Sequence, residues 1–255
     1  MMRRVQRYGW IPDLPDARDT VYMVPRAVRL PPKVDLRPHC PPVYDQGQLG
    51  SCTANAIGAA VQFERMKQKL TGASAAVPSR LFIYYNERVV EGTVSEDAGA
   101  QIRDGIKSVN RQGVCFETQW PYNIAKFTTR PPKPCYRTAL HNQALSYARI
   151  NPTLGQMRGC LASGWPFVFG FSVYDSFEGP TVARTGRATM PKPDEQLLGG
   201  HAVMAVGYDD AQKRFLVRNS WGVGWGLRGY FTMPYAYLTD RDLSDDFWTV
   251  RLVEA

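Results

Sequence analysis

The 255 residues provide enough chain for one large domain or two compact lobes, and 44% hydrophobic with 21% charged content excludes a disordered chain. Lys and Arg exceed Asp and Glu by 8 (31 − 23), but the basic residues are scattered, which favours a solvated surface over a nucleic-acid interface. No apolar run approaches the ~18 residues of a membrane span, and the opening MMRRVQRYGW lacks the apolar core of a secretory signal. Neither nucleic acid nor membrane is therefore expected as a partner. The compartment stays unknown, with a cytoplasmic location as the default and secretion by another route left open.

The predicted elements change from helices to strands along the chain. Residues 1–30 form an arm that its prolines keep extended. Helices are predicted over 52–70, 78–90 and 98–113, with a shorter helix near 154–163. Short β-rich runs separated by Gly, Pro and Asp predict strands at 166–174, 201–210, 214–221, 229–234 and 247–253. Helices first and strands second indicate an α+β fold of two lobes, one mainly helical over 31–145 and one β-rich over 146–255.

Cys52 lies where a polar, glycine-rich loop becomes an apolar helix. A thiol becomes a good nucleophile when its pKa falls, and both the positive end of a helix and a neighbouring imidazolium lower it. Ser51 is placed to cap the helix, so Cys52 lies in the first turn, where backbone N–H groups are unpaired. The alternative is a buried, inert cysteine.

The second half of the chain offers partners for this thiol. Of three histidines, His201 follows two glycines and starts an apolar strand, whereas His39 and His141 lie in polar or extended segments. Asn219 ends another apolar run, where its side-chain oxygen can accept the imidazole N–H. Trp221 can shield that hydrogen bond from water.

Gln46 precedes Cys52 by six residues (52 − 46). Its amide and the Cys52 backbone N–H together can hold an oxyanion, the largest electrostatic contribution in acyl transfer.

Three blocks, QGQLGSC, GGHAVMAVGY and RNSWGVGWGLRGYF, carry a resemblance to the papain-like cysteine peptidases, which share the order Gln, Cys, His, Asn. The resemblance covers roughly residues 31–255. It implies a two-lobed fold, a helical lobe with an antiparallel, β-barrel-like lobe, and an active site in the cleft between them. It also implies Cys52 as nucleophile, His201 as base and acid, Asn219 as its orienting group and Gln46 in the oxyanion hole.

By the same resemblance Gly99 falls where the substrate backbone docks as an added strand, and Gly170, Phe171 and Ala202 fall near a nonpolar S2 pocket. Where the family usually has a cysteine and an aromatic residue around the nucleophile, this chain has Leu49 and Thr53. In this it is similar to a bacterial, xylellain-type branch.

We therefore expect a monomeric cysteine endopeptidase that acts on peptides or proteins without metal or organic cofactor. Two alternatives stay open, a catalytically silent papain-fold binding module and a thiol acyltransferase. The arm at 1–30 is a candidate short pro-segment that covers the cleft through Tyr8, Trp10 and Leu14.

Other features have simpler interpretations. Four further cysteines (5 − 1) allow up to two bridges, of which Cys115 with Cys135 is the first candidate, unless all are reduced. Glu96 and Asp97 are interpreted as a charge pair at a helix N-terminus. The acidic stretch at 240–246 is interpreted as a solvated turn rather than a calcium site.

Overall fold

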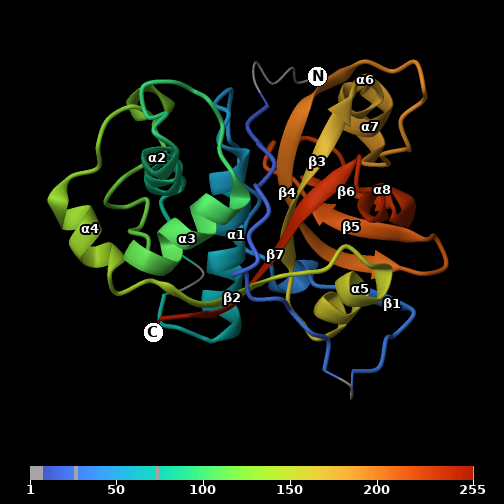
Figure 1. The fold of residues 1–255 in the computed structure, drawn as a ribbon, viewed down its shortest axis with the longest axis horizontal. Helices are drawn as coiled ribbons and strands as arrows, with labels where there is room; N and C mark the ends of the chain where they lie inside the picture. Colours follow the sequence, from blue (N-terminus) through green and yellow to red (C-terminus); the bar gives the residue numbers. More distant parts are fainter. Residues whose placement is uncertain (1–7, 26–27, 73–74, 255) are drawn as a thin grey trace.

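The computed structural model of the chain describes residues 8–25, 28–72 and 75–254. Helices gather on one side of the molecule and a twisted antiparallel sheet on the other, with α1 between them (Figure 1). This arrangement agrees with the predicted α+β class. The first seven residues of the predicted arm, and its residues 26–27, lie outside the described ranges.

The long helix α1, Cys52–Lys67, has nearly every residue buried because its first turns carry no charge and pack on both the sheet and the helical side. The following helices are shorter than α1. Their bounds are α2 Arg80–Glu91, α3 Ile102–Gln112, α4 Lys133–Ala139, α5 Leu154–Ala162, α6 Asp175–Glu178, α7 Pro180–Thr185 and α8 Tyr235–Thr239, with single turns of 3₁₀ helix at Arg37–His39 and Ile124–Lys126. Pro132 takes the N-cap position of α4, and Pro134 lies in its first turn, where proline fits because the backbone N–H has no helical partner.

Six strands form a continuous antiparallel sheet in the order β2-β7-β3-β4-β5-β6, with β1 paired to β4. The sheet is open, because its two end strands, β2 and β6, do not pair with each other. The strands run over β1 Lys33–Asp35, β2 Ala144–Arg149, β3 Phe167–Tyr174, β4 Leu197–Asp209, β5 Arg214–Arg218, β6 Tyr230–Pro234 and β7 Ser244–Val253. The domain bounds 31–145 and 146–255 remain a prediction, and β1 shows that the first of these residues already belong to the sheet.

Two apolar cores follow from this arrangement. One lies between α1, α2, α3 and the near face of the sheet, and the other covers the far face of the sheet with aromatic side chains. Successive residues of β3 point to opposite faces, so Gly170 faces the helices whereas the ring of Phe171 enters the aromatic core.

All five cysteines lie within the described residues, and all are free thiols. The predicted bridge between Cys115 and Cys135 is therefore not formed, although the two buried thiols interact with each other. Cys135 on α4 and Cys115 after α3 are both buried in the apolar core of the helical side, where packing rather than a covalent link holds them.

The arm crosses the front of the molecule between the two sides (Figure 1). It forms two single parallel bridges, Trp10 to Ala100 and Val21 to Arg149, so the arm contacts the helical side and the sheet in turn. Its path lies over the start of α1, where the candidate nucleophile is placed.

Candidate active site

Cys52 is the first residue of α1 and is 0% exposed. Ser51 takes the N-cap position, but its hydroxyl does not cap the helix. The hydroxyl instead lies 2.5 Å from the hydroxyl of Tyr122 and accepts a hydrogen bond from the amide of Asn55. The predicted side-chain cap is therefore wrong, because two nearer polar groups use the serine oxygen.

The sulfur of Cys52 faces the backbone N–H of Ala202, the residue that follows His201, and the backbone N–H of Gly9. This contact shows that the start of α1 and β4 meet although they are 149 residues apart (201 − 52). Burial raises the pKa of the Cys52 thiol to about 12, and the N–H groups offset only part of that rise.

His201 lies on β4 and is buried, with its Nε2 2.9 Å from Oδ1 of Asn219. Because the amide oxygen accepts a hydrogen bond here, the proton of the neutral ring is on Nε2. Nδ1 then carries the lone pair, and it has no hydrogen-bond partner among the described residues. Burial lowers the pKa of His201 to about 4, with the hydrogen bond to Asn219 acting in the opposite direction.

These two pKa shifts favour a neutral thiol and a neutral imidazole in the structure. A thiolate–imidazolium pair between Cys52 and His201 is therefore disfavoured while the site is sealed from water. The groups that seal it belong to the arm, since Tyr8 and Gly9 lie against His201 and Cys52.

Aromatic rings fix the imidazole of His201. Trp221 stacks on it with ring centroids 5.0 Å apart. Phe171, which belongs to the aromatic core, meets the imidazole edge-on with ring centroids 5.8 Å apart. Tyr8 of the arm covers it at 5.9 Å. Trp221 thus covers one face of the imidazole, whereas the Phe171 ring supports His201 from the face of β3 opposite Gly170.

Gln46 is held beside this site by two hydrogen bonds. Its side-chain oxygen accepts from the hydroxyl of Ser220 at 2.6 Å, and its Nε2 donates to the carbonyl of Leu49 at 3.0 Å. Since Nε2 carries two hydrogens, one remains for another acceptor. The bond from Ser220 connects the loop before α1 to the residue after Asn219.

Asp97 is a site residue that the sequence interpretation missed. Its carboxylate accepts hydrogen bonds from the backbone N–H of Gly50, at 3.1 and 3.0 Å, and from the hydroxyl of Tyr84. The predicted role at a helix N-terminus is wrong, because α3 begins only at Ile102. Asp97 ties the loop before the nucleophile to the helical side, and no local pattern in the sequence indicates this contact.

The arm lies along Gly99 and Ala100 in the manner of an added strand. The carbonyl of Gly9 accepts from the N–H of Ala100 at 2.8 Å, and the N–H of Ile11 donates to the carbonyl of Ala100 at 3.1 Å. Gly99 has φ +78°, and a side chain there would meet the Gly9 carbonyl at 2.4 Å. Glycine at position 99 therefore permits both the backbone conformation and the close approach of another chain.

The indole of Trp10 fills a space beside the reactive groups and is 9% exposed. A methyl group on Gly170 would meet this ring at 1.9 Å, and one on Gly200 at 2.6 Å. The backbone N–H of Trp10 donates to the carbonyl of Gly200 at 2.9 Å. The arm thus packs closely against Gly200, one of the two glycines that precede His201.

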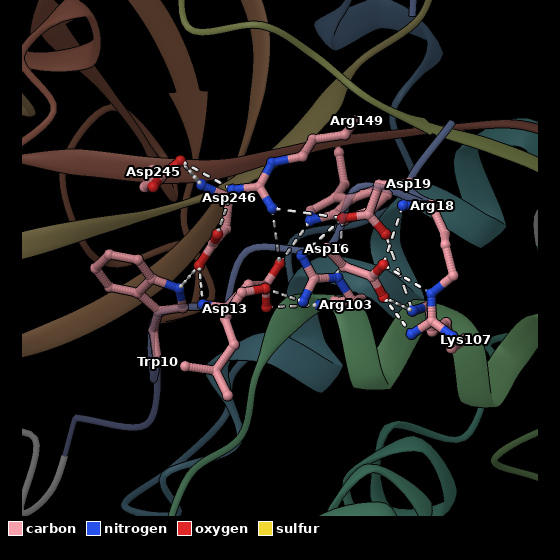
Figure 2. Close-up of polar contacts among 12 residues, drawn as sticks. Trp10, Asp13, Asp16, Arg18, Asp19, Arg103, Lys107, Arg149, Asp245 and Asp246 are labelled. Atoms are coloured by element: carbon pink, nitrogen blue, oxygen red, sulfur yellow. Dashed lines mark hydrogen bonds and ion pairs between the residues drawn. The ribbon is translucent and has the colours of Figure 1, made fainter. Parts of the chain in front are cut away.

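Leu14 does not cover the cleft as predicted, since it is 72% exposed. The arm is instead held by Asp246 on β7, whose carboxylate accepts a hydrogen bond from the indole N–H of Trp10 at 3.0 Å (Figure 2). Asp246 is fully buried, so the interpretation of residues 240–246 as a solvated turn is wrong for this residue. Among the side chains that the structure describes, no group of three or more His, Cys, Asp or Glu is arranged to hold a metal ion.

Comparison with known proteins agrees with this geometry. The family model described as "Papain family cysteine protease" matches residues 30–240. The chain therefore belongs to the papain family of cysteine proteases, and it is a cysteine-type peptidase by family.

Within the family, the chain is 45% identical to the crystal structure of xylellain, a cysteine protease from Xylella fastidiosa, with a TM-score of 0.90 and 98% of each chain covered. A peptidase C1-like protein of Acanthamoeba polyphaga mimivirus is 43% identical over 97% of this chain and 88% of its own length. A cathepsin B-like protein of Giardia intestinalis is 31% identical over 80% of this chain and 69% of its own length. The resemblance to a bacterial, xylellain-type branch is confirmed.

Proposed function

We propose that the chain is an endopeptidase in which Cys52, His201, Asn219 and Gln46 carry the chemistry. The observation that supports this most is the meeting of the Cys52 thiol with the segment of His201 and Ala202, beside an imidazole whose far nitrogen is bound to Asn219. Because Nε2 of His201 is hydrogen-bonded to Asn219, Nδ1 is the ring nitrogen that can take a proton from the thiol.

The reaction begins when the arm leaves and water and substrate enter. Hydration lowers the pKa of the Cys52 thiol and raises that of His201, because burial is the largest cause of both shifts. The proton then passes from sulfur to Nδ1, and the N-terminus of α1 stabilises the thiolate. Asn219 keeps the protonated ring in place through Nε2.

In the chemical step the thiolate attacks the peptide carbonyl and forms a carbon–sulfur bond. Gln46 Nε2 and the backbone N–H of Cys52 stabilise the negative oxygen of the tetrahedral intermediate. The carbon–nitrogen bond breaks as His201 gives its proton to the leaving amine. Water, deprotonated by the same imidazole, then hydrolyses the thioester and regenerates the thiol.

The substrate-binding residues follow from the path of the arm. Gly99 and Ala100 offer backbone groups to an extended peptide, and Gly170 with Ala202 borders the space that Trp10 now fills. Phe171 acts instead as a positioning residue under His201. The arm blocks the cleft in this state, because it uses the same backbone groups and covers His201.

The test compares single variants in full-length chain that also carries Trp10→Ala, a change expected to loosen the arm. Cys52→Ala abolishes cleavage of a denatured protein substrate, whereas Cys40→Ala, a change at another free thiol, leaves it intact. Retained hydrolysis in Cys52→Ala rejects the assignment.

The two alternatives give different results in the same assays. A silent binding module is not modified at Cys52 by an epoxysuccinyl affinity label even when the arm is loosened. An acyltransferase yields amide products in preference to free acid when an amine nucleophile is added. Modification of Cys52 together with free-acid products supports the peptidase.

A further inference from the structure

A cluster of charged residues holds the arm at a place separate from the catalytic groups (Figure 2). The arm contributes three aspartates at a spacing of three residues, Asp13, Asp16 and Asp19. The body of the protein contributes three cations, Arg103 and Lys107 on α3 and Arg149 at the end of β2. We call these six residues the clasp.

The contacts of the clasp are specific and mostly removed from water. Arg103 donates to Asp19 through Nη2 at 2.7 Å and Nε at 3.1 Å, with side chains only 6% and 5% exposed. Lys107 lies 3.5 Å from Asp16 and 3.9 Å from Asp19. The two N–H groups of Arg103 thus converge on one oxygen of Asp19, and both hydrogen bonds are strengthened by the opposite charges.

Backbone and aromatic groups complete the site. The carboxylate of Asp13 accepts from the backbone N–H of Arg103 at 3.1 Å and from the indole of Trp248 at 2.9 Å. Its own N–H donates to Asp246 at 2.8 Å. Arg103 also donates to the carbonyl of Leu14, so both the main chain and the side chains of the arm are bound, and the N–H of Asp19 closes a turn with the carbonyl of Asp16.

The three cations belong to the body of the protein, so they lose the aspartates of the arm when the arm leaves. Arg149 keeps Asp245 and Asp246, at 3.2 and 3.0 Å, but loses Asp19 at 3.6 Å and Asp13 at 3.9 Å. Arg103 and Lys107 have no carboxylate partner among the described residues other than those of the arm. Arg103 and Lys107 therefore lose their ion-pair partners in the open enzyme, although the carboxylate of Asp104 remains near both.

We propose that Arg103, Lys107 and Arg149 form a second binding site, specific for an acidic segment with carboxyl groups three residues apart, which the arm's own residues 13–19 occupy in the closed state. The site holds the arm over Cys52 by charge, and its occupant is displaced by ionic strength. The inference concerns binding and stands apart from the chemistry proposed for Cys52.

The experiment measures the arm directly, without catalysis. In full-length Cys52→Ala protein, hydrogen–deuterium exchange reports the backbone N–H groups of Trp10 and Ile11, which are bonded across the cleft. The double change Asp16→Asn with Asp19→Asn is expected to raise their exchange at least ~10-fold at low salt, since breaking buried ion pairs is costly. Asp194→Asn, at an exposed acidic residue outside the clasp, serves as control and leaves exchange unchanged.

Two further measurements, a salt dependence and a charge reversal, test the clasp if the Asp16→Asn/Asp19→Asn variant folds poorly. Raising NaCl from 0.05 to 0.5 M speeds exchange at Trp10 in the parent protein and has less effect in the double variant. The charges of the partly exposed pair can also be reversed. The double variant Asp16→Lys/Lys107→Asp is expected to show slower hydrogen–deuterium exchange at Trp10 than Asp16→Lys alone. Equal exchange at Trp10 in the parent and Asp16→Asn/Asp19→Asn proteins at low salt, with both folded, overturns the proposal, and so does a parent protein insensitive to salt.

Discussion

Trp10→Ala in the full-length chain is expected to open the cleft. The indole is 9% exposed, and an aromatic side chain of this kind buries roughly 150–250 Å², which corresponds to about 4–6 kcal/mol at ~25 cal/mol per Å². The lost hydrogen bond adds little, because the Asp246 oxygen still accepts from the N–H of Asp13. Measured truncations of buried tryptophan cost about 3–5 kcal/mol, so we take about 3 kcal/mol for the docked arm.

This free energy changes the ratio of docked to open arm by about a hundredfold. An epoxysuccinyl affinity label reacts only with Cys52 in the open state, so its rate of modification, followed by intact mass and peptide mapping, rises by about the same factor. Leu14→Ala is the matched control, since Leu14 belongs to the same arm but is 72% exposed, and its labelling rate should equal that of the parent.

A second comparison separates shape from hydrogen bonding. Trp10→Phe keeps most of the apolar ring but removes the donor to Asp246, so it is expected to raise labelling by about tenfold or less. If Trp10→Ala is labelled no faster than Leu14→Ala while both keep their thermal stability, the arm does not control access to Cys52. Absence of labelling in every variant contradicts the proposed chemistry rather than the docking of the arm.

Two further predictions concern pH and the oxyanion. In the docked arm, burial and then the nearby charge of Asp246 raise the pKa of Asp13 to about 7, against an ordinary value of 3.8. The docked carboxyl therefore binds its proton more tightly than the free one, so this contribution to docking is complete below about pH 4 and is lost as pH rises through about 7. Asp16 contributes little to this pH dependence of docking. The largest cause of its lowered pKa is the hydrogen bond from Arg18, which lies in the same arm segment and remains when the arm is released. Exchange at the Trp10 amide, corrected for intrinsic rates, should increase from pH 5 to pH 8 in Cys52→Ala protein and lose this dependence in Asp13→Asn; an unchanged pH profile in that variant contradicts the assignment. Gln46→Ala in the Trp10→Ala chain should lower turnover by ~10²–10³-fold, while the rate at which the epoxysuccinyl label modifies Cys52 changes little. Normal turnover in this variant removes Gln46 from the mechanism.

Much of the site was predictable because its signals are local. A charge-free run after Cys52 predicted the buried α1, and short β-rich runs separated by Gly, Pro and Asp predicted β3 to β7. Those patterns depend on helix and strand periods, which each segment carries within itself. The conjunction of three blocks then indicated the family, which the family model confirms.

Other features depend on contacts between distant segments. Ser51 gives its hydroxyl to Tyr122 rather than to the helix, and Asp97 holds the loop at Gly50, choices made by neighbours 71 and 47 residues away. Asp246 looked like part of a solvated turn, but in the structure it is buried under Trp10. No local pattern specifies these partners.

The sequence by itself determined the family and the main helices and strands that carry the proposed catalytic residues, because residue type and periodicity are properties of short stretches. The tertiary structure decided their state: it brought the arm onto Cys52 and His201, and burial then made both groups neutral. Protonation depends on how much water and which charges surround a group, and those surroundings exist only after residues far apart in the chain have come together.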